Sequence, residues 1–319
     1  MSRKISFFIM LLLLCIPVSL IQAQSTQHTL DDLTYHLYEP DNPAGLLVAL
    51  HPTASSGKSM QALTGLNEYA DEHNWLIVYP DSPDLRWSDS NSESDDVARV
   101  SALIEQLQTE YNIAPDDTYL TGYGTGGILA LELLCTLPDS PAGVAITGAM
   151  PVPQVINRCE ASAPATDILI MRGEQDIFYQ RDGNPTIQSM SVDDTLSFYS
   201  DLMTCEPGES DASTLIIRTC ADEHQLAYYE IADAVGNWLR TDKDYALNQF
   251  GFDTTERVVQ FFTGDDSWQR SQDAYDTDAL ARTYLSYVPE NYNPDEALPI
   301  LVILHGKTTN GANTAASTD

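Results

Sequence analysis

Three glycines in residues 121–127 have the spacing of a catalytic turn, but the residue that would react is absent. The pattern Gly-x-Ser-x-Gly forms a sharp turn from a strand into a helix and exposes a serine hydroxyl for attack on a carbonyl carbon. Here Gly122 and Gly126 flank Gly124, which stands where the serine would be, and the sequence has no other such pattern. Glycine has no side chain that could act as a nucleophile. The segment therefore predicts the geometry of acyl transfer without its first reactant.

Short apolar runs bounded by turn residues predict the strands that would position this turn. Continuous apolar runs of this length suit strands that are buried on both faces of a parallel sheet. The runs are residues 46–50, 76–79, 119–121, 143–147, 168–171 and 226–231. Segments with helical spacing lie between or after them, at residues 60–73, 96–111, 126–137 and 254–262. This alternation predicts the α/β class, with a mostly parallel sheet and helices on both faces.

The charge of the chain excludes some partners. The 319 residues include 15 Lys and Arg against 47 Asp and Glu, which gives a formal net charge of −32. A strongly acidic surface repels nucleic acid and anionic lipid, so we expect neither as a partner. The charge itself is a matter of solubility or of adaptation to salt, and it does not determine the fold.

The first 23 residues have the pattern of a secretory signal. Arg3 and Lys4 precede an apolar run over residues 5–21, and Ala23 ends a segment that resembles a cleavage site. An uncleaved membrane anchor is the alternative, because the run is close to the length that spans a bilayer. We expect cleavage after Ala23, a secreted protein and no membrane contact afterwards.

Cysteine usage agrees with an exported protein. Four cysteines remain after removal of the signal and allow three pairings into two disulfides. Cys205 and Cys220 flank a short acidic segment and are expected to bridge each other, which leaves Cys135 with Cys159. Buried free thiols are the alternative. No pair of cysteines or histidines has metal-ligand spacing, so we expect no metal.

The N-terminal pattern begins again near the end of the chain. Residues 35–40 (YHLYEP) are echoed by residues 284–289 (YLSYVP), and residues 47–52 (LVALHP) by residues 301–306 (LVILHG). Two blocks in the same order, a domain apart, indicate a tandem duplication, with chance similarity of strand segments as the alternative. We therefore expect one domain over residues 24–262, an acidic linker over residues 263–281 and the start of a truncated second copy over residues 282–319. The expected partner of the first copy is the second domain of the same longer chain.

Several motifs together resemble the secreted esterases of the polyhydroxybutyrate depolymerase and feruloyl esterase family. The resemblance covers about residues 30–262. Its motifs are His51 after a strand, Val78-Tyr79-Pro80, Trp87 followed by Asp95-Asp96-Val97, the turn at 121–127, Cys135, Arg172 to Asp176 and the Cys205/Cys220 pair. The resemblance implies the α/β-hydrolase fold and cleavage of carboxylic esters by Ser, Asp and His in that order. It implies no cofactor or metal, and a substrate that is an ester, a polyester or a plant-polymer ester.

The family pattern also assigns the positions that such a mechanism needs. It places the nucleophile at Gly124, the triad acid at Asp176 and the histidine at Gly236. The sequence has no histidine between His224 and His305, so the lack of a triad base does not depend on the alignment. The oxyanion-hole amides would be those of Thr53 and Thr125. Pro52 replaces the usual glycine before Thr53 and removes one N–H.

Three hypotheses follow from this pattern. The first is a secreted esterase-like protein whose present copy is catalytically dead and binds substrate or supports a second copy. The second is a pure binding module, with a cleft lined by Trp87, Tyr123 and Trp238. The third is an active ester hydrolase that uses non-standard residues.

Overall fold

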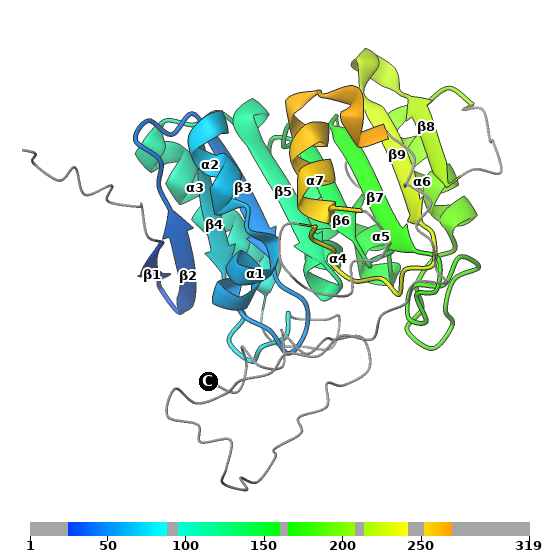
Figure 1. Ribbon diagram of the computed structural model, residues 1–319, viewed down its shortest axis with the longest axis horizontal. Helices are drawn as coiled ribbons and strands as arrows, with labels where there is room; N and C mark the ends of the chain where they lie inside the picture. Colours follow the sequence, from blue (N-terminus) through cyan, green and yellow to red (C-terminus); the bar gives the residue numbers. More distant parts are fainter. Residues whose placement is uncertain (1–24, 88–94, 160–164, 208–213, 242–251, 270–319) are drawn as a thin grey trace, which may run out of the picture.

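The computed structural model describes residues 25–87, 95–159, 165–207, 214–241 and 252–269 (Figure 1). The expected signal peptide, most of the expected linker and the expected second copy lie outside these residues.

The described strands form one sheet in the order β1-β2-β4-β3-β5-β6-β7-β9-β8 (Figure 1). They are β1 (Thr26–Leu30), β2 (Leu33–Tyr38), β3 (Gly45–Leu50), β4 (Trp75–Pro80), β5 (Thr118–Tyr123), β6 (Gly143–Thr147), β7 (Asp167–Gly173), β8 (Leu215–Thr219) and β9 (Gln225–Ile231). Neighbouring strands pair in parallel along the run β4-β3-β5-β6-β7-β9. At the two sides of the sheet, β1, β2 and β8 pair antiparallel with their neighbours. The six apolar runs of the sequence all fall in the parallel part, so the predicted fold class is confirmed.

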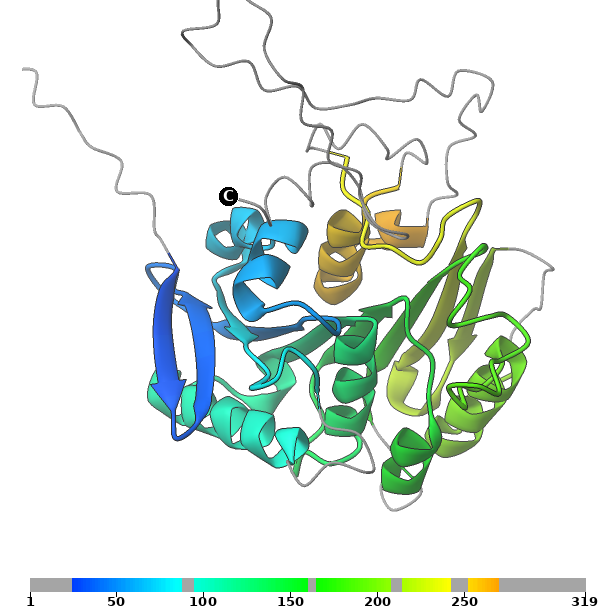
Figure 2. The ribbon, with the colours of Figure 1, turned by 90° about the horizontal axis from the view of Figure 1, so that it is seen from below.

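Two layers of helices cover the sheet. They are α1 (Gly57–Thr64), α2 (Asn67–His73), α3 (Asp96–Tyr111), α4 (Thr125–Leu134), α5 (Pro153–Cys159), α6 (Val192–Met203) and α7 (Thr254–Thr263). Figure 2 shows α1, α2 and α7 on one face and the other four on the opposite face. Successive strand residues point to opposite faces, so Leu46 and Val48 enter one core and Leu47 and Ala49 the other. Two buried faces explain why the central strands are apolar throughout.

The helix predictions hold where the sequence carries a cap. α3 spans the predicted residues 96–111, and the Asp95 carboxylate accepts the N–H of Ala98 at 3.1 Å. α7 begins after Asp253, whose carboxylate accepts the N–H of Glu256 at 3.0 Å.

The single helix expected over residues 60–73 was wrong, because two helices meet near Gly65. That glycine has φ 60°, and a Cβ there would collide with the guanidinium of Arg240. α4 also ends at Leu134 rather than at residue 137.

The boundary of the domain lies beyond residue 262. After α7, the short helix η3 (Asp266–Gln269) carries Trp268, which is buried and contacts Phe261 edge-on with ring centroids 5.2 Å apart. Residues 263–269 therefore belong to the packed domain and not to a linker.

Both expected disulfides are present. Cys135 pairs with Cys159, and Cys205 pairs with Cys220. The first joins the end of α4 to the end of α5, and the second joins α6 to β8. In the part of the chain that the structure describes, no helix is long and apolar enough to cross a membrane.

Candidate functional site

The turn from β5 into α4 has the shape that its glycines predict. Gly124 connects the two elements with φ 56° and ψ −124°, and its N–H donates to the carbonyl of Thr147 at 3.0 Å. A Cβ on Gly126 would lie 2.6 Å from the carbonyl oxygen of His51, and a Cβ on Gly122 would collide with the backbone of Gly126. Only glycine fits the two flanking positions, which lets the turn pack this closely. The backbone of a nucleophile elbow is therefore complete, and its central side chain is missing.

Pro52 borders the space above Gly124. A Cβ placed on Gly124 would lie 3.3 Å from Cβ of Pro52, and its next neighbours would be 3.9 and 4.0 Å away. A side chain at residue 124 would therefore need Pro52 to shift, and with φ 56° it would have a backbone conformation that residues other than glycine rarely adopt. The sequence prediction recognised Pro52 as a departure from the family pattern, but not this contact.

The predicted triad acid is buried and fixed by its own loop. Asp176 follows β7, and its Oδ1 accepts the N–H groups of Phe178 at 2.8 Å and Tyr179 at 3.0 Å. Burial raises the pKa of the Asp176 carboxyl, while these two amides and the positive charge of Arg172 oppose that shift.

Arg172 stabilises the loop that carries Asp176. Its buried guanidinium donates to the carbonyl oxygens of Tyr179 at 3.3 Å and Glu174 at 3.4 Å. It also donates to the Tyr228 hydroxyl at 3.0 Å and forms an ion pair with Glu230. A buried charge with these partners is satisfied on all sides, so it fixes the backbone that carries Asp176.

The space expected for the triad histidine is occupied. Gly236 has φ 79°, and a Cβ there would lie 2.6 Å from Cγ of Asp176 and closer still to Oδ2. The loop that carries Gly236 also packs tightly on the sheet, since a Cβ on Gly148 would lie 2.7 Å from the Gly236 carbonyl oxygen. A Cβ on Gly173 would collide with the N atom of Gly236. The loop thus packs closely on the strand ends, and the Asp176 carboxylate lies where a side chain of residue 236 would begin.

The two described histidines that the sequence prediction considered do not replace the missing base. His51 is fully buried: its Nε2 accepts the N–H of Ser82 at 3.0 Å, and its Nδ1 lies 2.7 Å from the Pro52 carbonyl oxygen. Burial lowers the pKa of His51, although the Pro52 carbonyl and nearby carboxylates oppose this. His224 lies beside Asp167, the first residue of β7. This is the amino-terminal end of the parallel strands, whereas Gly124 lies at their carboxyl-terminal end.

The two expected oxyanion-hole residues do come together. The hydroxyl oxygens of Thr53 and Thr125 are 3.0 Å apart, which joins the loop after β3 to the first residue of α4. Within the described residues, neither amide N–H has a hydrogen-bond acceptor. The positive end of the α4 dipole adds to the field at this point. The arrangement can bind a carbonyl or carboxylate oxygen.

The three aromatic residues predicted to line one cleft do not meet in one cleft. Trp87 is buried with the core of α3 and α4, where its Nε1 donates to the His51 carbonyl at 2.7 Å. Trp238 is buried in the opposite core, and its Nε1 donates to the Thr255 hydroxyl at 2.8 Å. The intervening sheet separates the two rings, so this prediction was wrong.

Tyr123 alone of the three borders the triad positions. Its hydroxyl donates to Oδ1 of Asn237 at 3.4 Å. Burial raises its pKa to about 12, with a further contribution from the Asp176 charge, so the phenol is neutral at physiological pH. Among the described residues no group of three His, Cys, Asp or Glu side chains could hold a metal ion.

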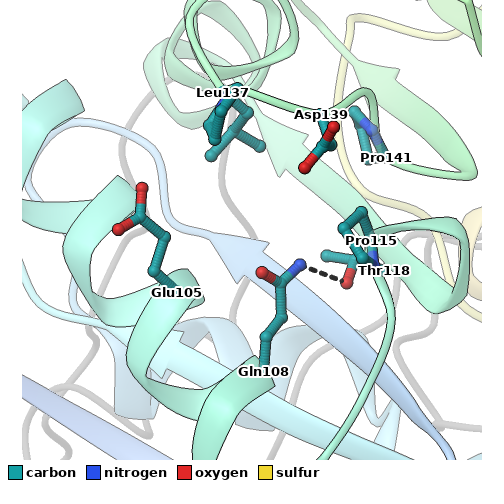
Figure 3. Close-up of a pocket in the computed structure, with 8 residues that line it drawn as sticks. Glu105, Gln108, Pro115, Thr118, Leu137, Asp139 and Pro141 are labelled. Atoms are coloured by element: carbon teal, nitrogen blue, oxygen red, sulfur yellow. Dashed lines mark hydrogen bonds between the residues drawn. The ribbon is translucent and has the colours of Figure 1, made fainter.

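Two surface cavities lie near α4 and α3. One, of about 100 Å³, runs beside α4 and is lined by Thr125 and Trp87. The other, of about 20 Å³, is shown in Figure 3 and includes Gln108, which donates to the Thr118 hydroxyl at 2.8 Å. Because Thr118 begins β5 and Gly124 follows its end, the second cavity lies at the edge of the sheet away from the elbow.

Comparisons with known proteins find similarity to esterases. The model of the phospholipase/carboxylesterase family matches residues 53–190. A protein of Nocardia uniformis subsp. tsuyamanensis named as an esterase, NocK, is 31% identical over 157 residues, which are 46% of this chain and 45% of that protein. Feruloyl esterase B of Thermothelomyces thermophilus is 24% identical over 149 residues, which are 43% of this chain and 51% of that protein. The chain thus spans about half the length of these relatives.

A solved structure supports the same fold. The acetyl xylan esterase from Aspergillus awamori superposes with a TM-score of 0.53 at 13% identity, over 67% of this chain and 95% of that chain. At this identity the likeness concerns the fold alone. The chain therefore has the α/β-hydrolase fold, and its sequence is similar to that of carboxylic-ester hydrolases.

Proposed function

We propose that this protein is a secreted, catalytically inactive relative of carboxylesterases that binds carboxylic esters without cleaving them. The observation that carries the proposal is the close packing of Asp176 at Gly236, because it leaves no space for a side chain at the position where the family pattern has its histidine. Gly124 removes the nucleophile as well. Loss of the serine and histidine together leaves only the rate contribution of binding and of the oxyanion donors, about 10³–10⁴-fold over water in a well-studied protease.

The retained features favour binding. The elbow backbone, the free N–H groups of Thr53 and Thr125, and the start of α4 form a site for a carbonyl oxygen. Exposed apolar side chains border the same edge of the sheet, because they lie in loops that follow the parallel strands β4, β7 and β9. These side chains are Leu85, Ile177, Phe178, Ile187 and Val235. An apolar rim around an oxygen-binding turn suits an ester with an apolar acyl or alkyl part.

The ligand class comes from the relatives. Their names describe esterases of feruloyl and acetylxylan esters, and the expected family adds polyesters. We assign this chain a polymer-bound ester as its ligand, and a role in holding that ligand for a second esterase-like copy, whose start we expect over residues 282–319. The two disulfides are consistent with the secreted location that residues 1–23 predict.

Two assays on the purified protein test the proposal. Ethyl ferulate is titrated against the protein with ligand-observed NMR, and p-nitrophenyl butyrate is used as a substrate for turnover. We expect saturable binding of ethyl ferulate and no release of p-nitrophenol above the rate with heat-denatured protein. Asp176→Asn and Thr125→Ala serve as matched variants.

Turnover by the wild type that Thr125→Ala or Asp176→Asn abolishes would contradict the proposal. It would favour the alternative of an active hydrolase with non-standard residues. Absence of any ester binding would contradict the binding role.

A further inference from the structure

The loop that carries Thr53 is attached to the loop that follows β4. We call residues 51–57 the Thr53 loop and residues 81–87 the β4 loop. Hydrogen bonds join the two loops on both sides of Thr53. They run from Nε1 of Trp87 to the His51 carbonyl at 2.7 Å, from the Ala54 N–H to the Leu85 carbonyl at 2.7 Å and from the Gly57 N–H to Oδ1 of Asp81 at 2.5 Å. The β4 loop therefore determines where the Thr53 amide lies.

One of these hydrogen bonds joins two residues with an unfavourable backbone conformation. Ala54 has φ 59° and Leu85 has φ 55°. Residues other than glycine rarely adopt this conformation, and they keep it only where the surrounding structure imposes it. The two loops are thus expected to relax if another contact between them is lost.

His51 supplies a contact between the loops that depends on protonation. Its Nε2 accepts the N–H of Ser82 at 3.0 Å, and its Nδ1 lies 2.7 Å from the Pro52 carbonyl oxygen. These partners assign the neutral ring with its proton on Nδ1, because a protonated imidazole has no acceptor. A second proton on Nε2 would point at the Ser82 N–H, so the hydrogen bond between them would be lost.

The side chain of Ser82 offers the protonated ring a different partner. Its Oγ is buried and has no hydrogen-bond partner among the described residues. Buried polar atoms seldom lack a partner, and a hydroxyl oxygen can accept where an N–H cannot. A rotation of Ser82 that brings Oγ to Nε2 would satisfy both groups. That rotation moves the backbone of the β4 loop, because the N–H of the same residue has to leave.

The ring is surrounded by groups that favour opposite protonation states. Burial lowers the pKa of His51, whereas the charges of Asp81, which follows β4, and Asp96, which begins α3, oppose this. On β2, Nε2 of His36 lies 3.5 Å from Oδ2 of Asp81, and Arg99 on α3 pairs with Asp96 at 3.1 Å. Both neighbours reduce the effect of the two carboxylates when they are charged.

The remaining neighbour of the imidazole is aromatic. The rings of His51 and Trp87 have centroids 4.6 Å apart, and Trp87 lines a cavity together with Arg86 and Glu132, which carry opposite charges. With its pKa lowered, His51 is neutral at physiological pH and takes up its second proton below about pH 6.5.

We infer that His51 is a positioning residue for the Thr53 amide, and that its protonation moves the β4 loop and weakens the oxygen-binding turn. The turn is affected because the hydroxyl oxygens of Thr53 and Thr125 are 3.0 Å apart, and a shift of the Thr53 loop separates them. The proton comes from solvent, and hydrogen bonds are the only other bonds that change. The effect on a ligand rests on the proposed ester-binding function, whereas the movement of the loops does not.

The movement is tested on the full chain by NMR from about pH 8 to about pH 5. The ring signal of His51, identified by its absence from His51→Gln, should titrate below about pH 6.5. The amide signals of Ala54 and Gly57 should shift with the same midpoint, and these shifts should be absent from His51→Gln. Circular dichroism checks that the chain stays folded. A ring that titrates without these amides, or only as the chain unfolds, would overturn the inference.

Two serine variants test the second partner of the ring. Ser82→Ala removes the acceptor of the protonated imidazole, so the midpoint of the His51 titration should fall by about one pH unit. Ser101→Ala, on α3, removes another buried hydroxyl without a partner among the described residues and should leave the midpoint unchanged. Equal midpoints in the two variants would exclude the proposed role of Ser82.

The effect on the turn is measured with ethyl ferulate. Its Kd for the wild type should rise about tenfold between about pH 7.5 and about pH 5, while His51→Gln should have the same Kd at both. A wild-type Kd that does not change with pH would show that His51 does not position the turn. If ethyl ferulate does not bind at either pH, the proposed function fails, and the NMR titration alone decides whether His51 moves the loops.

Discussion

The carboxylate of Asp176 lies where the side chain of residue 236 would begin. A Cβ on Gly236 would come within 2.6 Å of Cγ of Asp176, a distance that real Cβ atoms do not adopt. Asp176 cannot swing away freely, because Phe178 and Tyr179 both donate their backbone N–H groups to its Oδ1. The Asp176 carboxylate thus occupies the space that a side chain of residue 236 would need.

This contact predicts an unusual cost for a small substitution. Gly236→Ala should lower the free energy of unfolding by about 1–3 kcal/mol more than Gly264→Ala does. Both glycines have positive φ, but a Cβ on Gly264 would meet nothing within 4 Å. The comparison therefore separates the collision from the conformational cost that both share. Urea unfolding of the two variants measures the difference, and equal losses would show that the loop around residue 236 is open.

The same contact predicts that simple restoration of the triad fails. The double variant Gly124→Ser with Gly236→His should hydrolyse p-nitrophenyl butyrate no faster than the wild type. The imidazole cannot be placed without displacing Asp176, and Pro52 stands 3.3 Å from the first atom of the new serine side chain. Circular dichroism confirms that the variant is folded. Hydrolysis tenfold above the wild type would mean that the active geometry survives.

His51 predicts a loss of stability on the acid side. Its pKa is lowered by burial, so the unfolded chain takes up a proton at a higher pH than the native state does. The stability that neutral His51 contributes is present above about pH 6.5, its unfolded pKa, and is lost as the pH falls through the lowered native value. A proton on Nε2 would also oppose the N–H of Ser82.

A substitution checks this assignment. In urea unfolding at a series of pH values from about 5 to 8, His51→Gln should reduce the acid-side loss, since an amide both donates and accepts without titrating. His73→Gln, on α2, controls for the removal of a histidine outside this contact. An unchanged pH dependence in His51→Gln would rule out His51 as the source.

The disulfides predict a further loss on removal. The Cys205–Cys220 bond closes a loop with a sequence separation of 15. Replacement of both cysteines by serine should lower the free energy of unfolding by about 3 kcal/mol in the chain-entropy model. The Cys135–Cys159 bond, with a separation of 24, should contribute slightly more. Thermal and urea unfolding of the two double variants compare them, and a loss below about 1 kcal/mol for either would contradict this account.

The parts of the fold that follow from local chemistry could be predicted from the sequence. The central strands are apolar on both faces, and α3 carries its Asp95 cap, so both were predicted. β1, β2 and β8 were missed because they lie at the sides of the sheet. There β1 is mostly exposed and β2 and β8 mix polar with apolar residues.

The candidate site, too, was predicted correctly where local sequence determines it and wrongly where tertiary packing does. The glycine frame predicted the elbow backbone, and the order of the family motifs paired Thr53 with Thr125, whose hydroxyl oxygens are 3.0 Å apart. The cleft of Trp87 and Trp238 was wrong, because the sequence does not say which face of the sheet each ring enters. The contact of Asp176 with Gly236 depends on the path of a loop, which only tertiary packing determines. In the sequence, only the glycines at 148 and 173, against which the loop packs, indicate this close approach.

The central claim is that no residue in the described part of this chain can form an acyl or phosphonyl intermediate. The most direct measurement is intact-protein mass spectrometry after incubation with an alkyl fluorophosphonate, which traps activated serine and threonine hydroxyls irreversibly. We predict the unmodified mass for the wild type. A stoichiometric mass increase that maps to Thr125, or to any other residue, and that Asp176→Asn prevents, would contradict the account.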